Sequence, residues 1–162
     1  MKIISRSAQE TIGFAKRLSK ILRQGDVLCL RGNLGAGKTT FVKGLALGLK
    51  VKRAVVTSPT FVLMNVYDGK IPIYHFDLYR IEGAELERMG CEEFFYGEGV
   101  AVIEWAERLK TAMPKEYFSV VFEHGGDDLR ALTIKAQGKL YRQRLMESVS
   151  LRAFFAKQSL NF

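Results

Sequence analysis

Residues 32–39, Gly-Asn-Leu-Gly-Ala-Gly-Lys-Thr, match the pattern G-x-x-x-x-G-K-[ST] of phosphate-binding loops (P-loops). Its glycines leave the backbone free to curl around an anion, so that several amide groups can donate hydrogen bonds to its oxygens. Lys38 can reach the β- and γ-phosphates of a nucleotide, and Thr39 offers a hydroxyl group to magnesium. A chance match in a chain of this length is expected at well under about 1% from average residue usage.

The residues on either side of this loop predict the strand and the helix that such a loop joins. Residues 27–30 (VLCL) form a short apolar run, which is typical of a strand buried on both faces of a sheet. A helix is expected to follow the loop and to continue through about Leu49. The N-terminal amides of this helix and the positive end of its dipole would point at the bound anion.

The rest of the chain predicts further helices and strands around this unit. Ser7 and Glu10 fit a capping box, which begins a helix that Gly25 ends. The later elements are expected as a hairpin of residues 61–67 and 71–79, a short helix at 83–89, a buried strand at 99–103, a hairpin of residues 118–122 and 129–134, and an amphipathic helix at 138–157.

These elements predict an α/β fold. We expect a single P-loop NTPase-like domain of three layers, with a mixed, partly parallel central sheet, over residues 1–138. Residues 139–162 are expected to form a basic, amphipathic C-terminal segment that is helical and packs on the same domain. The chain has 162 residues, of which 48% are hydrophobic and 26% charged, and this length and composition suit one globular domain.

Composition also predicts where the protein works. No apolar run approaches the ~18 residues of a membrane span, and the N-terminal residues lack the apolar core of a secretory signal. The two cysteines, Cys29 and Cys91, do not make a disulfide scaffold. We therefore expect a cytoplasmic protein that does not engage a membrane.

The net charge of +8 is distributed unevenly along the chain. Residues 1–53 carry 12 Lys/Arg and 2 Asp/Glu (+10), residues 54–138 carry 8 and 14 (−6), and residues 139–162 carry 5 and 1 (+4). Basic ends suggest an anionic partner, whereas the alternative is a dispersed, solvated surface.

Two acids are candidates for metal binding and catalysis beside the loop. Residues 100–104 (VAVIE) predict a buried strand that ends in Glu104, the place at which nucleotide-hydrolysing proteins of this kind carry a metal-binding acid. Asp77 lies in the aromatic segment YHFDLYR, and a buried carboxylate there requires a specific partner. The alternatives are a surface position for Glu104 and a structural ion pair of Asp77 with Arg80 or another basic residue.

Three hydroxyl groups cluster around a proline in residues 57–61, TSPTF. Many nucleotide-dependent switches place a hydroxyl-bearing segment after the phosphate loop, where it orders around the γ-phosphate and magnesium. Turn initiation explains the Ser-Pro-Thr sequence equally well.

The four segments GNLGAGKTTF, TSPTFVL, YHFDLYR and VIEWAER, in this order and at these spacings, resemble the TsaE family. Members are small bacterial P-loop ATPases needed for threonylcarbamoyl-adenosine formation in tRNA. The resemblance covers about residues 5–137. Asn33 departs from the aspartate that is frequent in the family, and the segment after Gly138 matches no family motif.

The resemblance implies a role for individual residues. Thr39 and Glu104 would bind magnesium, and Asp77 would be a second acid, acting through a metal-bound water or by orienting the attacking water. Lys38, Asp77 and Glu104 would form the catalytic group. The residues implied to contact or approach ATP are Thr11, Asn33, Gly35, Ala36, Gly37, Lys38, Thr39, Thr40, Ser58, Thr60, Trp105 and Arg130.

The resemblance also implies partners and a cycle. The protein would hydrolyse ATP with Mg²⁺, weakly alone and faster with TsaB-like and TsaD-like partners in a hetero-oligomeric complex, and would reset that complex between rounds of modification. Transfer RNA would be reached through the partners or touched directly. The alternatives are a small-molecule P-loop kinase and a tRNA-binding module in which nucleotide is only a structural ligand.

Overall fold

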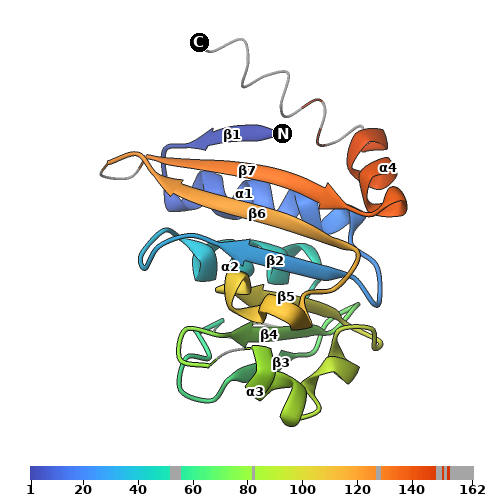
Figure 1. Ribbon diagram of the computed structural model, residues 1–162. Helices are drawn as coiled ribbons and strands as arrows, with labels where there is room; N and C mark the ends of the chain where they lie inside the picture. Colours follow the sequence, from blue (N-terminus) through green and yellow to red (C-terminus); the bar gives the residue numbers. More distant parts are fainter. Residues whose placement is uncertain (52–55, 82, 127–128, 149–150, 152, 154–162) are drawn as a thin grey trace.

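A seven-stranded sheet runs through the molecule in the order β1-β7-β6-β2-β5-β4-β3 (Figure 1). A computed structural model describes residues 1–51, 56–81, 83–126, 129–148, 151 and 153. The four strands β6, β2, β5 and β4 are parallel, and antiparallel strands flank them at both edges. The strands are β1 (Lys2–Ser5), β2 (Val27–Arg31), β3 (Met64–Tyr67), β4 (Ile73–Asp77), β5 (Val100–Glu104), β6 (Tyr117–His124) and β7 (Arg130–Gln137).

Helices cover both faces of the sheet. The α-helices are α1 (Ala8–Leu18), α2 (Lys38–Gly48), α3 (Gly83–Arg88) and α4 (Lys139–Glu147), and the 3₁₀ helices are η1 (Ser19–Ile21), η2 (Cys91–Phe94) and η3 (Ala106–Ala112). Helices α1, α2 and α4 share a core with one face of the sheet, and α3, η2 and η3 share a core with the other. The predicted three-layer α/β fold with a mixed sheet is confirmed.

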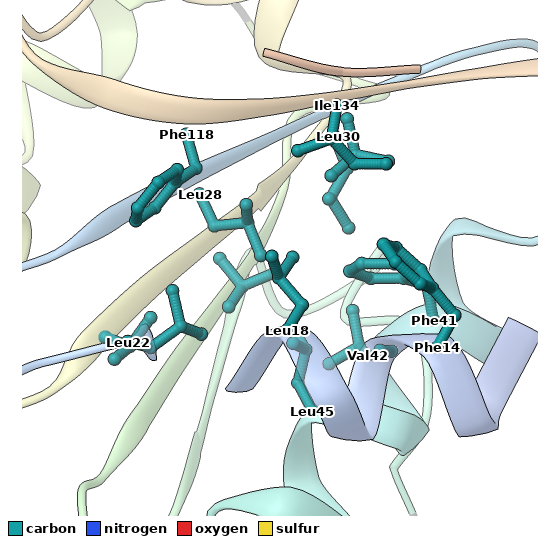
Figure 2. Close-up of a cluster of buried hydrophobic side chains, with 14 of the residues drawn as sticks. Phe14, Leu18, Leu22, Leu28, Leu30, Phe41, Val42, Leu45, Phe118 and Ile134 are labelled. Carbon is teal, nitrogen blue, oxygen red and sulfur yellow. The ribbon is translucent and has the colours of Figure 1, made fainter. Parts of the chain in front are cut away.

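Strand β2 shows why the sheet needs helices on both faces. Because successive side chains of a strand point to opposite sides, Leu28 and Leu30 pack against α1 and α2, whereas Val27 and Cys29 face α3, η2 and η3. All four residues are 0% exposed. Figure 2 shows the first of these cores, in which Leu28 and Leu30 meet side chains that include Phe14 and Leu18 of α1 and Phe41, Val42 and Leu45 of α2.

The first helix begins as the sequence predicts but ends sooner. The Ser7 hydroxyl accepts a hydrogen bond from the Glu10 amide at 3.1 Å, and the Glu10 carboxylate accepts one from the amide of Arg6 at 2.7 Å. The α-helix stops at Leu18 and a 3₁₀ turn continues to Ile21, before the predicted end at Gly25.

Other elements also differ from the predictions. Strand β3 begins at Met64, not at residue 61, because the carbonyl of Pro59 accepts hydrogen bonds from the amides of Val62 and Leu63 in a turn. Helix α4 ends at Glu147, since Ser148 has an extended backbone. Most of the predicted helix beyond residue 148 lies outside the described residues. Strand β1 was not predicted.

None of the helices in the described part of the chain is long and apolar enough to cross a membrane.

Candidate functional site

The glycine-rich loop connects the carboxyl end of β2 to the amino end of α2, and its glycines meet two different demands. Gly32 has a φ of 147°, and a Cβ atom there would lie 2.7 Å from the carbonyl oxygen of Phe122 in β6. Gly37 caps α2 in a left-handed conformation with a φ of 99°. A side chain at either position would strain the backbone, so the loop conformation depends on glycine.

Lys38 is the cation of this loop, and it is buried. Its Nζ donates hydrogen bonds to the carbonyl oxygens of Gly32 at 2.6 Å and Asn33 at 3.1 Å, and it lies 3.9 Å from the centre of the Trp105 ring. Burial lowers the pKa of Lys38, and the nearby carboxylates of Glu104, Glu107 and Asp77 oppose that shift. A bound anion next to Lys38 would therefore raise its pKa and favour the charged form of its side chain.

The two predicted acids lie side by side at the carboxyl ends of neighbouring parallel strands. Asp77 of β4 is in register with Glu104 of β5, and the residues are 4% and 3% exposed. One Glu104 oxygen, Oε1, accepts a hydrogen bond from the Thr39 hydroxyl at 2.9 Å and faces Nε2 of His75 at 2.9 Å. Glu104 is thus a buried group joined to the loop, and the surface alternative is wrong.

Asp77 binds the hydroxyl-rich segment that follows the loop in sequence. Its Oδ2 accepts hydrogen bonds from Ser58 Oγ at 2.6 Å and Thr60 Oγ1 at 2.5 Å, and its Oδ1 accepts one from the amide of Tyr79 at 2.9 Å. The guanidinium of Arg80 instead lies 4.5 Å from the centre of the Phe61 ring. Hydroxyl groups, not an arginine, therefore satisfy this carboxylate.

A pocket of about 380 Å³ brings most of the predicted residues together. It is lined by Leu34, Gly35, Ala36, Gly37, Lys38, Thr39, Thr40, Ser58, Thr60, Asp77, Tyr79, Glu104 and Trp105. Trp105 has a left-handed backbone with a φ of 59°, a conformation that costs energy for a residue other than glycine and recurs at functional sites.

Three predicted residues do not line this pocket. Thr11 is buried at the start of α1, with its hydroxyl 2.8 Å from that of Ser5. Asn33 is exposed and contributes its backbone carbonyl to Lys38. Arg130 packs beside the loop, since a Cβ atom on Gly37 would lie 3.4 Å from its side chain.

Leu34 of the glycine-rich loop lines the pocket but was not among the predicted residues, and two further residues at the site were missed from the sequence. Tyr79 lines the pocket, and its ring lies 5.0 Å from that of Trp105. His75 lies behind the pocket and contacts Glu104. Both belong to the segment YHFDLYR, and the alternation of side chains along β4 was a signal, because it places His75 on the same face as Asp77.

The fold and the site define a class: an α/β domain in which a glycine-rich loop of phosphate-binding sequence joins a central parallel strand to a helix, beside two buried acids. Residues 5–132 match the family described as "Threonylcarbamoyl adenosine biosynthesis protein TsaE". The chain belongs to the TsaE family.

Individual relatives agree with this assignment. The tRNA threonylcarbamoyladenosine biosynthesis protein TsaE of Bacillus subtilis is 45% identical, over 88% of this chain and 89% of the relative. The protein of the same name from Treponema pallidum is 42% identical, over 83% of this chain and 99% of the relative. The crystal structure of Bacillus subtilis YdiB superimposes with a TM-score of 0.78 at 39% identity, covering 91% and 92% of the two chains.

Proposed function

We propose that this protein is the Mg²⁺-dependent ATP-binding and ATP-hydrolysing subunit of the bacterial tRNA N6-threonylcarbamoyladenosine modification machinery. The observation that carries the proposal is the pocket in which the glycine-rich loop and its buried lysine face two buried carboxylates. The family and the named relatives supply the pathway.

The residues of the pocket fit ATP and magnesium. The loop offers backbone amides without side chains in the way, and Lys38 offers a positive charge. No three His, Cys, Asp or Glu side chains among the described residues gather closely enough to hold a metal ion. Magnesium commonly takes only one or two protein ligands and completes its shell with phosphate oxygens and water. The oxygens of Thr39 and Glu104 fit that requirement, and bound magnesium would neutralise charge on the phosphates.

The remaining groups of the site act on charge and on water. Lys38 and the loop amides stabilise the negative charge that develops on the phosphate oxygens during hydrolysis. Asp77 orients the attacking water in this proposal, and Trp105 and Tyr79 form the aromatic wall of the pocket. Ser58 and Thr60 both donate to Oδ2 of Asp77, so this oxygen has to exchange a hydroxyl partner before it can accept a hydrogen bond from water.

That arrangement supports weak hydrolysis by the protein alone and stimulation by partners. A TsaB-like or TsaD-like partner that shifts the segment 57–60 would release Asp77 for water. Hydrolysis then resets the complex for the next round of tRNA modification. Transfer RNA takes part through the TsaD-like partner or by direct contact.

The test uses ATP labelled at the γ-phosphate, wild-type protein and the variant Glu104→Ala, each alone and with TsaB and TsaD homologues. We expect the label to appear as free phosphate, faster with the partners, and the variant to lose hydrolysis by about 100-fold or more, since removal of one charge-stabilising group costs that much in many enzymes. Modification of tRNA should fall in parallel.

Two outcomes would contradict the proposal. Transfer of the label to a small acceptor would identify a kinase. Full tRNA modification by Glu104→Ala, despite lost hydrolysis, would make ATP a structural ligand.

A further inference from the structure

His75 is a fully buried polar residue that the proposed mechanism does not yet use. It lies on β4 between Ile73 and Asp77, and all three side chains point to the α2 side of the sheet, as alternation along a strand requires. The residue is 0% exposed, and its Nε2 lies 2.9 Å from Oε1 of Glu104. The only hydrogen-bonding contact of this imidazole within the described chain is therefore to the acid at the back of the pocket.

The other ring nitrogen of His75, Nδ1, is buried without a hydrogen-bond partner among the described residues, and this lowers the stability of the protein. A buried polar atom without a partner is unfavourable, whereas an apolar side chain of similar size would avoid that cost. Because the carboxylate facing Nε2 accepts, the hydrogen of this contact is assigned to Nε2. The histidine is thus explained by the bond that it donates to Glu104, not by packing.

A second aromatic ring lies beside the imidazole. The Tyr67 ring lies 6.0 Å from the His75 ring, with 37° between their planes. The Tyr67 hydroxyl donates a hydrogen bond to the carbonyl oxygen of Thr57 at 3.1 Å and accepts one from the backbone amide of Thr57 at 3.4 Å. Tyr67 is therefore anchored at its hydroxyl group, and its ring lies beside that of His75.

The two oxygens of Glu104 are used unequally. Oε1 receives hydrogen bonds from both His75 and Thr39, whereas within the described chain no hydrogen bond reaches Oε2. Thr39 is itself a proposed magnesium ligand, so His75 is the donor that stays with the carboxylate when the Thr39 hydroxyl turns to a cation. We infer that His75 is a positioning residue: it holds Glu104 by Oε1 and leaves Oε2 for a hard divalent cation. This inference rests on the proposed function.

The test compares two replacements of His75 with a packing control. His75→Leu removes the donor, and His75→Gln keeps an amide N–H near the position of Nε2. Ile73→Ala removes buried volume from the same face of the same strand. Binding of ATP is followed by the fluorescence of Trp105, the single tryptophan of the chain, in EDTA and at increasing Mg²⁺ concentrations. Thermal unfolding confirms that each variant is folded.

We expect His75→Leu to raise the Mg²⁺ concentration for half-maximal ATP binding by about 10-fold or more, as loss of a group that orients a metal ligand commonly does. Affinity for ATP in EDTA should stay within about threefold, and His75→Gln should recover most of the Mg²⁺ response. Ile73→Ala should lower only thermal stability.

Three results would overturn the inference: an unchanged Mg²⁺ requirement in His75→Leu, no recovery in His75→Gln, or the same shift in Ile73→Ala. If the wild-type protein binds ATP without any effect of Mg²⁺, the proposed function fails first and the role of His75 fails with it. The wild-type titration therefore separates the two failures.

Discussion

At the scale of single residues, the charge of Lys38 depends on what occupies the pocket. Burial lowers the pKa of its ammonium group below the ordinary value of 10.5, and neighbouring carboxylates only partly restore it. ATP brings several negative charges to the same place and so favours the protonated form. At a pH above the pKa of Lys38 in the free protein, binding must take up a proton, and affinity falls as pH rises.

We therefore expect the affinity for ATP to fall as the pH rises, and this fall should begin at a pH below 10.5, the ordinary pKa of lysine. The fall should reach at most about tenfold per pH unit. Trp105 fluorescence, recorded with ATP between about pH 7 and about pH 10, measures this decline. Lys38→Arg is the matched control, because a guanidinium stays charged throughout that range. The variant should bind more weakly but without the decline, and equal slopes for the two proteins would show that another group titrates.

At the scale of secondary-structure elements, helix α4 is attached by one ion pair to the segment before β2. Arg144 donates two hydrogen bonds to the Asp26 carboxylate, at 2.7 Å and 2.8 Å, and a third to the carbonyl oxygen of Ile21 at 3.3 Å. The two side chains of the pair are 14% and 6% exposed. Tyr141 of the same helix packs on Phe118 of β6 with 4.7 Å between ring centroids. Helix α4 thereby joins the core.

Arg144→Ala should lower the free energy of unfolding by roughly 3 kcal/mol, because it leaves Asp26 charged and nearly buried. That figure is the low end of the range for broken buried pairs, since the arginine keeps some contact with water. Urea unfolding measures the change. ATP affinity should not change, because Asp26 precedes β2 whereas the glycine-rich loop follows it.

Arg142→Ala is the control for this prediction. Arg142 is exposed on the same helix, so its removal should change stability by no more than about 0.5 kcal/mol. Equal losses from the two variants would mean that helix propensity, not the ion pair, attaches α4.

The elements also show which parts of the fold are encoded locally. The loop, its flanking strand and its helix were predictable, because glycine conformation and apolar runs act within a few residues. Strand β1 was not, since its four residues pair with β7, more than 120 residues away in the chain. The same holds for part of the site, because Lys38, Thr39, Asp77 and Glu104 lie in motifs that can be recognised in the sequence.

The contact between His75 and Glu104 was not predictable from those motifs, because it joins residues 29 positions apart. It arises when two parallel strands align. Long-range pairings of this kind leave little trace in one sequence, since each partner taken alone has an ordinary local environment.

At the scale of the whole molecule, the uneven charge of the sequence becomes a difference between the two helical layers. The layer of α1, η1 and α2 exposes mainly basic side chains, whereas the layer of α3, η2 and η3 exposes mainly acidic ones; the sheet separates them (Figure 1). The exposed basic residues of the first layer are Lys16, Arg17, Lys20 and Lys43, with Lys50 just beyond α2, and the exposed acids of the second include Glu85, Glu87, Glu93 and Glu107.

The prediction at this scale is that the basic layer faces an acidic partner protein or the tRNA backbone. The triple variant Lys16→Glu, Arg17→Glu and Lys20→Glu should weaken complex formation with TsaB and TsaD homologues, or tRNA modification, by about tenfold or more at low salt. The loss should shrink as salt screens the charges. None of the three residues lines the pocket, so ATP binding by the protein alone should stay unchanged.

A control variant separates the position of the charge from its total. Arg88→Glu, Lys115→Glu and Lys135→Glu change the net charge by the same amount at exposed positions outside the α1–α2 layer. If net charge alone steered association, both triple variants would lose assembly equally. If the basic layer is the contact surface, only the first triple variant would lose assembly. If the first triple variant assembles normally at low salt, α1 is not part of the interface.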